Sequence, residues 1–366
     1  MAITKTARKS YRVDISLGVD PLTGKQRRVR HNNLSTKRSA QQLENNLKQH
    51  YYNGTLLPDK SLTFEQLGNL YFQSYTINHK PTYIRTQRGY YSNHLFPYFK
   101  DCLIKKITQT HIREFREHLL TLNLSFNSIN KHMILLKKIF DVAVDESLIY
   151  TNPCLRIKKL KIIKQKMQFW TTTEYLHFIS CIREDEEVHK IFYQTAYLTG
   201  MRAGELLALK WSDINLVKQE IHVCKTVSRI DGKMIVTPPK SETSNRVITI
   251  NSKLAKMLAD WKLAQSKLLP AISTKDLVVF QHKTSHPIRE NFGTKKIQRI
   301  CKRCAVHPIR LHDFRHSHVA LLIDNGENIT VIKERMGHAS ITTTIDTYGH
   351  LFPNKQREMS DKLDFL

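Results

Sequence analysis

The spacing of apolar residues changes several times along this chain, and this pattern limits the available folds more than any other feature. Residues 11–17 alternate between apolar and polar, which predicts a strand with one buried face. A second strand is expected at 26–30 and a helix at 37–52. The first part of the chain, residues 1–57, is therefore expected to form a small module of strands and one helix.

From Thr63 the spacing becomes helical, and Thr63 itself suits the N-cap of the first helix. Further helices are predicted at 82–94, 109–120 and 128–144, so residues 60–157 are expected to form a helical domain. The tyrosines and phenylalanines between positions 83 and 99 could stack on nucleic-acid bases, although a place in the core is the commoner role for such residues.

The last segment, residues 165–366, contains both the alternating spacing of strands and the spacing of helices. A helix is expected to begin after Thr171, which forms a capping box with Glu174, and another to end at Gly200. Short strands are predicted at 220–226, 233–237 and 246–250, with Asp231-Gly232 as the turn between the first two. The remainder is expected to be helical. The chain as a whole is predicted to be mainly α with small β-sheets, an α+β protein of three domains.

Positive charge is spread over the whole chain. Lysine and arginine number 58 against 32 acidic residues, a formal net charge of +26, and residues 1–57, 60–160 and 161–366 each carry an excess. A basic tail would concentrate the charge, whereas a protein that surrounds a polyanion carries it on every domain. Double-stranded DNA is therefore the expected partner, and a protein kept soluble by positive charge is the alternative.

Two basic clusters are candidate DNA contacts outside the last domain. Arg27, Arg28 and Arg30 lie on the second predicted strand, which could enter a DNA groove or belong to a solvated hairpin. Lys158, Lys159 and Lys161 lie in an expected linker, where they could follow a phosphate backbone.

The six cysteines show no disulfide framework. Cys301 and Cys304 form a C-x-x-C with His307 nearby, but no second pair follows at zinc-finger spacing, so ordinary thiols are expected and no metal site. Neither a signal peptide nor an apolar run long enough to span a bilayer is found in the sequence. A cytoplasmic protein without a membrane partner is expected.

Six polar residues of the last domain could together break and rejoin a phosphodiester. They are Arg202, Lys240, His312, Arg315, His338 and Tyr348. Guanidinium groups hold phosphate oxygens through paired hydrogen bonds, a tyrosine hydroxyl can attack phosphorus, and lysine and histidine can move protons. His312 and Arg315 are three residues apart and so project from one helical face.

The motifs, in chain order, are T-G-M-R-A-G-E (199–205), Lys240, H-D-F-R-H (312–316), G-H (337–338) and Tyr348. The order of these motifs resembles that of the tyrosine recombinase (phage integrase) family. Residues 60–157 resemble the core-site-binding domain of that family, and residues 1–57 its arm-site-binding domain. Met336 is one departure, since leucine commonly precedes the glycine-histidine pair.

The resemblance implies a site-specific recombinase that needs no cofactor. Tyr348 would attack the scissile phosphate to form a 3′-phosphotyrosine, and Arg202 and Arg315 would hold the non-bridging oxygens. Lys240 would protonate the leaving 5′-oxygen, His312 would exchange a proton on the tyrosine side, and His338 would hydrogen-bond the phosphate.

The resemblance further implies a homotetramer on two DNA duplexes, with an excisionase and a host DNA-bending protein as additional partners. Residues 354–366 could pack on a neighbouring subunit or on their own domain. Integration and excision of a mobile element is the expected function. The alternatives are a chromosome-dimer resolvase, a type IB topoisomerase, or a DNA-binding protein that has kept this scaffold without catalysis.

Overall fold

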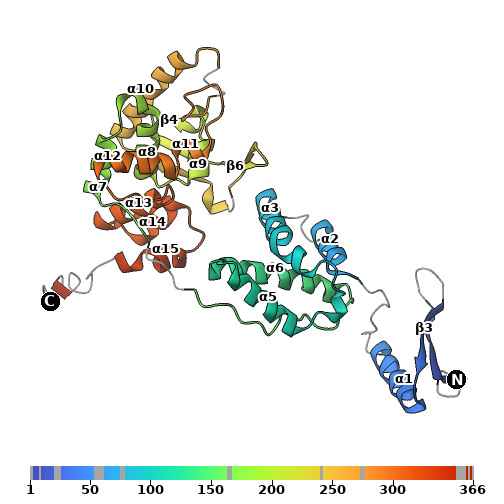
Figure 1. Cartoon of the computed structure of the whole chain (residues 1–366). Coiled ribbons are helices and arrows are strands. Elements are labelled where there is room, and N and C mark those ends of the chain that lie inside the picture. Colours follow the sequence, from blue (N-terminus) through green and yellow to red (C-terminus); the bar gives the residue numbers. More distant parts are fainter. Residues whose placement is uncertain are drawn as a thin grey trace. The chain divides into compact units, whose positions relative to one another are not determined.

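Two units make up the computed structural model, Met1–Ile163 and Lys164–Leu366 (Figure 1). The structure describes residues 3–7, 10–19, 26–52, 62–74, 79–162, 167–239, 242–272, 277–351, 360–361 and 363–364. Residues 20–25, Lys240 and most of residues 354–366 lie outside these ranges. The described chain is mainly helical with small sheets, which confirms the predicted fold class.

The N-terminal module is an antiparallel sheet with one helix. Its elements are β1 (Ile3–Ala7), β2 (Ser10–Val19), β3 (Gln26–Leu34) and α1 (Lys37–Tyr52), and the strand order is β1-β2-β3. Val13 and Ile15 of β2 point inward and are buried with Ala40 of α1. The two predicted strands and the helix are confirmed, whereas β1 was not predicted because its five residues include only one large apolar side chain.

The second part of the first unit is a helical domain, here residues 62–162. Its elements are α2 (Phe64–Ser74), α3 (Pro81–Tyr90), η1 (Tyr91–Leu95), α4 (Phe96–Phe99), η2 (Ile104–Lys106), α5 (Gln109–Thr121) and α6 (Phe126–Asp145). Phe64, Leu136 and Phe140 are fully buried in its core. The single helix predicted at 82–94 is wrong in one respect, because it is interrupted by the π-helical turn η1.

The second unit contains all six residues expected to act on a phosphodiester, and it is called the catalytic unit for that reason. Its helices are α7 (Thr172–Ser180), η3 (Glu184–Glu186), α8 (Glu187–Thr199), α9 (Ala203–Ala208), η4 (Trp211–Asp213), η5 (Glu242–Ser244), α10 (Ser252–Leu268), α11 (Arg289–Phe292), α12 (Thr294–Cys304), α13 (Asp313–Asp324), α14 (Ile329–Met336), α15 (Ile341–Tyr348) and η6 (Gly349–Leu351). The capping box that opens α7 is confirmed, since the Glu174 amide donates to Thr171 Oγ1 and the Thr171 amide to the Glu174 carboxylate.

The strands of the catalytic unit form two separate sheets. They are β4 (Ile214–Asn215), β5 (Glu220–Val223), β6 (Thr226–Ile230), β7 (Lys233–Thr237) and β8 (Arg246–Thr249), in the orders β4-β5-β8 and β6-β7. The single strand predicted at 220–226 is therefore wrong, because the chain leaves the first sheet at Cys224 and starts a hairpin at Thr226. The turn at Asp231-Gly232 joins β6 to β7, and both residues have positive φ.

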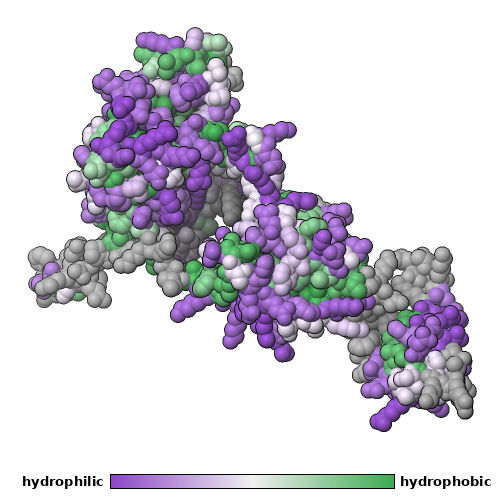
Figure 2. Space-filling model, viewed as in Figure 1, coloured by the Kyte–Doolittle hydropathy of each residue, from purple (hydrophilic) through white to green (hydrophobic). Residues whose placement is uncertain are grey.

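The core of the catalytic unit is large and apolar, and it includes Trp170, Trp211 and Trp261. Cys301 and Cys304 are buried in the same core, on the inner face of α12. Hydrophilic residues cover most of the surface visible in Figure 2. Within the described ranges, no helix is both long enough and apolar enough to cross a membrane.

Candidate active site

Arg315 lies in the first turn of α13 and is 3% exposed. Its Nη1 donates to the Gly200 carbonyl oxygen at 2.8 Å, and its Nη2 to the Met336 carbonyl oxygen at 2.6 Å. Burial, followed by the charges of Arg202 and Arg246, lowers the pKa of Arg315 to about 9. The group therefore stays protonated at neutral pH and links the end of α8 to the end of α14.

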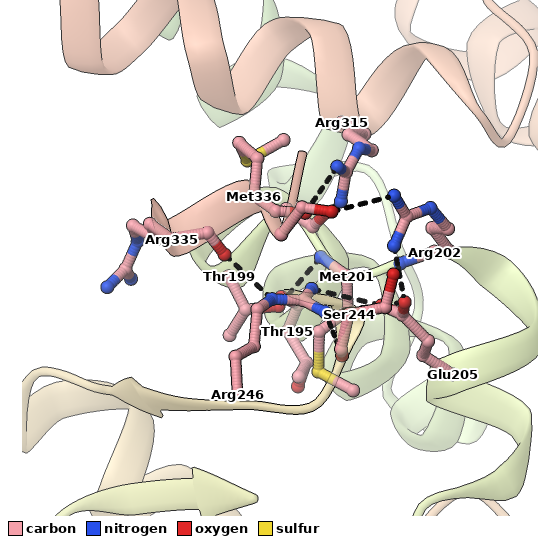
Figure 3. Close-up of polar contacts among 12 residues, drawn as sticks. Thr195, Thr199, Met201, Arg202, Glu205, Ser244, Arg246, Arg315, Arg335 and Met336 are labelled. Carbon is pink, nitrogen blue, oxygen red and sulfur yellow. Dashed lines mark hydrogen bonds and ion pairs between the residues drawn. The ribbon is translucent and has the colours of Figure 1, made fainter. Parts of the chain in front are cut away.

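Arg202 is the residue directly before α9, and its side chain is 37% exposed. Its Nη1 lies 2.7 Å from Glu205 Oε1, and its Nη2 donates to the Gly337 carbonyl oxygen at 3.4 Å. The two arginines thus bond to the carbonyls of consecutive residues, Met336 and Gly337 (Figure 3). Arg315 is enclosed by protein, whereas Arg202 is open to solvent.

His338 follows the residue that ends α14. Gly337 has a φ of +62°, a left-handed conformation that favours glycine, and it turns the chain out of the helix. The Nδ1 atom of His338 is hydrogen-bonded to Thr344 Oγ1 at 2.9 Å. Burial and the nearby charges of Arg315 and Arg202 lower the pKa of His338 to about 4, so the ring is neutral at pH 7.

Tyr348 is the last residue of α15 and is only 2% exposed. It packs with Val319, Ile332 and Met336 in a small apolar cluster. Burial raises the pKa of Tyr348 to about 12, so the phenol is protonated at neutral pH. Its hydroxyl lies 2.7 Å from His316 Nδ1, and the two groups are hydrogen-bonded.

The hydrogen-bond partner of the phenol, His316, was not assigned a role from the sequence. It stands directly after Arg315, and four residues after His312 on the same helical face, which is the signal that could have identified it. The rings of His312 and His316 meet edge-on with centroids 5.1 Å apart. Desolvation lowers the pKa of His316, so its ring is neutral and able to accept a proton.

His312 lies just before α13 and is partly exposed to solvent. Desolvation on its protein side, with the neighbouring His316 and Arg315, lowers the pKa of His312 to about 4. The structure therefore brings together five of the six residues expected at the site. Lys240 is the sixth, and it lies outside the described residues.

The candidate DNA contacts outside the catalytic unit are found on the surface. Arg28 and Arg30 are exposed on one face of β3, and Arg30 forms an ion pair with Asp14 at 2.9 Å. The side chain of Arg27 is not among the described ones. Lys158, Lys159 and Lys161 are all exposed.

Within the part of the chain that the structure describes, no group of three histidine, cysteine or acidic residues is placed to hold a metal ion. Besides the Glu205 carboxylate, the polar groups at the site are cations, neutral imidazoles and one phenol. Such a set can neutralise an anion that carries several oxygens and can transfer protons next to it. A phosphate diester is one such anion.

Comparison with known proteins identifies the family. Residues 168–355 match the phage integrase family, and residues 63–120 match the phage integrase N-terminal SAM-like domain. The chain belongs to the phage integrase family. Its members are tyrosine recombinases, so this protein is an enzyme that cuts and religates DNA, a site-specific integrase of a mobile element.

Individual relatives cover most or all of the chain. The ICEBs1 integrase of Bacillus subtilis (strain 168) is 44% identical over 369 residues, which is 100% of both chains. The Tn1549 transposon integrase, solved with a circular intermediate DNA, has a TM-score of 0.71 and 20% identity over 83% of this chain and 100% of that one. A lambda integrase tetramer bound to a Holliday junction has a TM-score of 0.60 and 17% identity over 93% of this chain and 96% of that one.

Proposed function

We propose that this integrase inserts and excises its element through a covalent bond between Tyr348 and the 3′-phosphate of the cut strand. One observation carries the proposal. The phenol of Tyr348 lies on the same chain as the two guanidinium groups, and it joins α13 through His316, the residue next to Arg315. A single protomer therefore holds the nucleophile and the charges that would stabilise its reaction.

In the proposed reaction, the oxygen of Tyr348 attacks the scissile phosphorus while the bond from phosphorus to the 5′-oxygen breaks. Arg202 and Arg315 hold the non-bridging oxygens, where negative charge builds up in the transition state. His338 donates a further hydrogen bond to them, and Lys240 protonates the departing 5′-oxygen. The free 5′-hydroxyl of a partner strand reverses these steps, so strands are exchanged without an external energy source.

The proton of the phenol needs an acceptor, because a group with a pKa of about 12 is not ionised at neutral pH. We assign this role first to His316, whose Nδ1 is already 2.7 Å from the phenol and whose ring is neutral. His312, exposed and edge-on to His316, is the neighbouring group that can exchange protons with solvent on the tyrosine side.

The other parts of the chain are proposed to bind DNA. Residues 1–57 would bind arm sites through β3, residues 60–157 would bind core sites, and residues 165–366 would carry out catalysis. The exposed Arg28 and Arg30 and the exposed linker lysines support this division. We further propose a homotetramer on two duplexes in the bacterial cytoplasm, assisted by an excisionase and a host DNA-bending protein. The tetrameric lambda integrase on a Holliday junction supports the assembly.

The decisive experiment uses a nicked suicide substrate made from the junction sequence of the excised element. The wild type should form a covalent adduct that is visible on a denaturing gel. Tyr348→Phe should bind the same DNA and form none. Tyr197→Phe is the matched control, because Tyr197 lies in the same unit and its ring stacks on Tyr175, with centroids 3.5 Å apart, in either form. An undiminished adduct from Tyr348→Phe would refute the assignment of the nucleophile.

The same substrate separates the alternatives. A DNA-binding protein without catalysis would give no adduct with the wild type. A topoisomerase would relax supercoiled plasmids that lack the junction sequence, and a chromosome-dimer resolvase would recombine chromosomal sites in place of the element's ends.

A further inference from the structure

A third guanidinium group, that of Arg246, lies near those of Arg202 and Arg315 (Figure 3). Arg246 is the first residue of β8, and its side chain is 6% exposed. It faces the interior of the unit together with Ile248, two residues further along the strand. A buried arginine is costly unless its donors are satisfied, so its partners show what its position achieves.

All the partners of Arg246 belong to segments that adjoin the proposed site. Nη2 and Nη1 lie 3.0 and 3.3 Å from the two carboxylate oxygens of Glu205. Nη1 also donates to the Ser244 carbonyl oxygen at 3.2 Å, and Nε donates to the Arg335 carbonyl oxygen at 2.8 Å. One planar group therefore joins α9, the turn before β8 and the end of α14.

Glu205 binds Arg202 as well as Arg246. Its Oε1 accepts from Arg202 Nη1 at 2.7 Å, and its Oε2 accepts from the Arg202 backbone amide at 2.9 Å. Both oxygens of the carboxylate are thus shared between the two arginines. Burial alone would raise the pKa of Glu205, but Arg246 and Arg202 hold it below its usual value, so the carboxylate stays ionised.

The aliphatic part of the Arg246 side chain packs against the turn that follows α14. A Cβ atom on Gly337 would lie 3.1 Å from Arg246 Cδ and 2.9 Å from the Thr243 carbonyl oxygen, so the turn is packed directly against Arg246 and its neighbours. This turn supplies the carbonyls that bond to Arg202 and Arg315, and it leads into His338.

We propose that Arg246 is a positioning residue that sets the directions of Arg202, through Glu205, and of the turn at Met336-Gly337 at the same time. In this role Arg246 would not contact the phosphate itself. The inference rests on the proposed function. A lysine cannot replace it, because one ammonium group lacks the planar set of donors that reaches a carboxylate and two carbonyls together.

The test compares Arg246→Met with the wild type on two suicide substrates. One has an ordinary phosphate at the cut site, and the other has an uncharged methylphosphonate there. A displaced Arg202 matters most where the phosphate carries its full negative charge. Adduct formation by Arg246→Met should fall about 100-fold on the phosphate, which is the usual cost of losing one transition-state donor, and at most about 10-fold on the methylphosphonate. Arg246→Lys should show the same difference between substrates.

Purely structural damage would lower the amount of active protein and reduce both rates by one factor. That result, or an unchanged rate on the phosphate, would overturn the proposal. If Arg246→Met fails to fold, Arg246→Lys provides the test, through the ratio of its rate on the phosphate to its rate on the methylphosphonate. Arg303→Met is the matched control, since it removes a different arginine–glutamate pair of the unit, Arg303 with Glu186 at 2.6 Å, and it should leave the ratio unchanged.

A further control removes the charge that Arg246→Met leaves behind. The double variant Glu205→Gln with Arg246→Met should regain thermal stability without regaining the rate on the phosphate, and a regained rate would overturn the proposal. Failure of the proposed function would be seen separately, because then the wild type itself would form no adduct at Tyr348 on the phosphate substrate.

Discussion

The helical domain and the catalytic unit bury different kinds of side chain. In the helical domain the buried polar residues are few, and they are Asn130, His132 and Asn152. In the catalytic unit they include Glu205, Arg246, Asp313, Arg315 and His318. Burying a charge costs free energy that hydrogen bonds only partly return. The difference teaches that the helical domain depends mainly on apolar packing and a few buried hydrogen bonds, whereas the catalytic unit also keeps buried charges, which the proposed reaction would use.

The largest expected effect comes from removing the most deeply buried charge. Arg315→Ala should lower the rate of adduct formation about 1000-fold, because it removes one of the two proposed phosphate clamps and leaves the carbonyls of Gly200 and Met336 without their donor. A single-turnover assay on the suicide substrate measures this rate. Arg315→Lys keeps the charge but not the fork, so a rate near that of the wild type would contradict the role proposed for the guanidinium.

An apolar truncation should affect only the helical domain. Leu136→Ala should reduce the stability of that domain by about 3 kcal/mol, since it leaves a cavity at a fully buried site. All three tryptophans lie in the catalytic unit, at positions 170, 211 and 261. The urea unfolding curve followed by tryptophan fluorescence should therefore stay unchanged, while the curve followed by far-ultraviolet circular dichroism should shift. Equal shifts would show that the two units unfold as one.

Acid should destabilise the catalytic unit through His318, which is 2% exposed. Burial, and then the charge of Arg335, lowers the pKa of His318 from 6.5 to about 3. The unfolded chain takes up this proton below pH 6.5, whereas the folded chain does not, so the stability is complete above pH 6.5 and is lost as the pH falls toward 3. Between pH 7 and pH 5 we expect a loss of about 2 kcal/mol from this residue.

Tryptophan-monitored urea unfolding at several pH values checks this effect. In His318→Gln the slope of stability against pH should be smaller, because the amide oxygen can still accept from Arg335 but does not titrate. An identical slope in the variant would assign the acid sensitivity to other groups.

The smallest effect is expected at the linker. Each of Lys158→Ala, Lys159→Ala and Lys161→Ala should reduce the slope of log affinity against log salt by about 0.9 if the lysine contacts a DNA phosphate. Filter binding or anisotropy over a range of salt concentrations measures the slope. Adduct formation at saturating DNA should not change, and a slope identical to the wild type would exclude that lysine from the interface.

Much of the fold could be predicted, because long amphipathic segments carry a strong periodic signal. The helices at 109–121 and 126–145 lie within a few residues of the predicted ranges. Short elements were harder, since β1 has five residues and the chain between 220 and 230 is divided between two sheets. Which sheet a short strand joins is decided by partners distant in sequence, and no local pattern contains that information.

Contacts between residues distant in sequence also limited the prediction of the site. The expected residues stand in recognisable motifs, but His316 and Arg246 were not identified. Arg246 occupies an inward position of β8 beside Ile248, where a strand pattern normally has an apolar residue. Its role depends on Glu205, 41 residues earlier in the chain, and only the folded structure shows that contact.

The 2% exposure of the Tyr348 side chain has a consequence for fidelity. The proposed nucleophile is covered by apolar neighbours and must be uncovered before it can meet a phosphate, and DNA binding would supply the free energy for that rearrangement. Sequences that bind loosely leave the phenol covered, whereas a correct site supplies enough free energy to release it. We therefore expect discrimination between the true target and the rest of a genome to be greater in cutting than in binding.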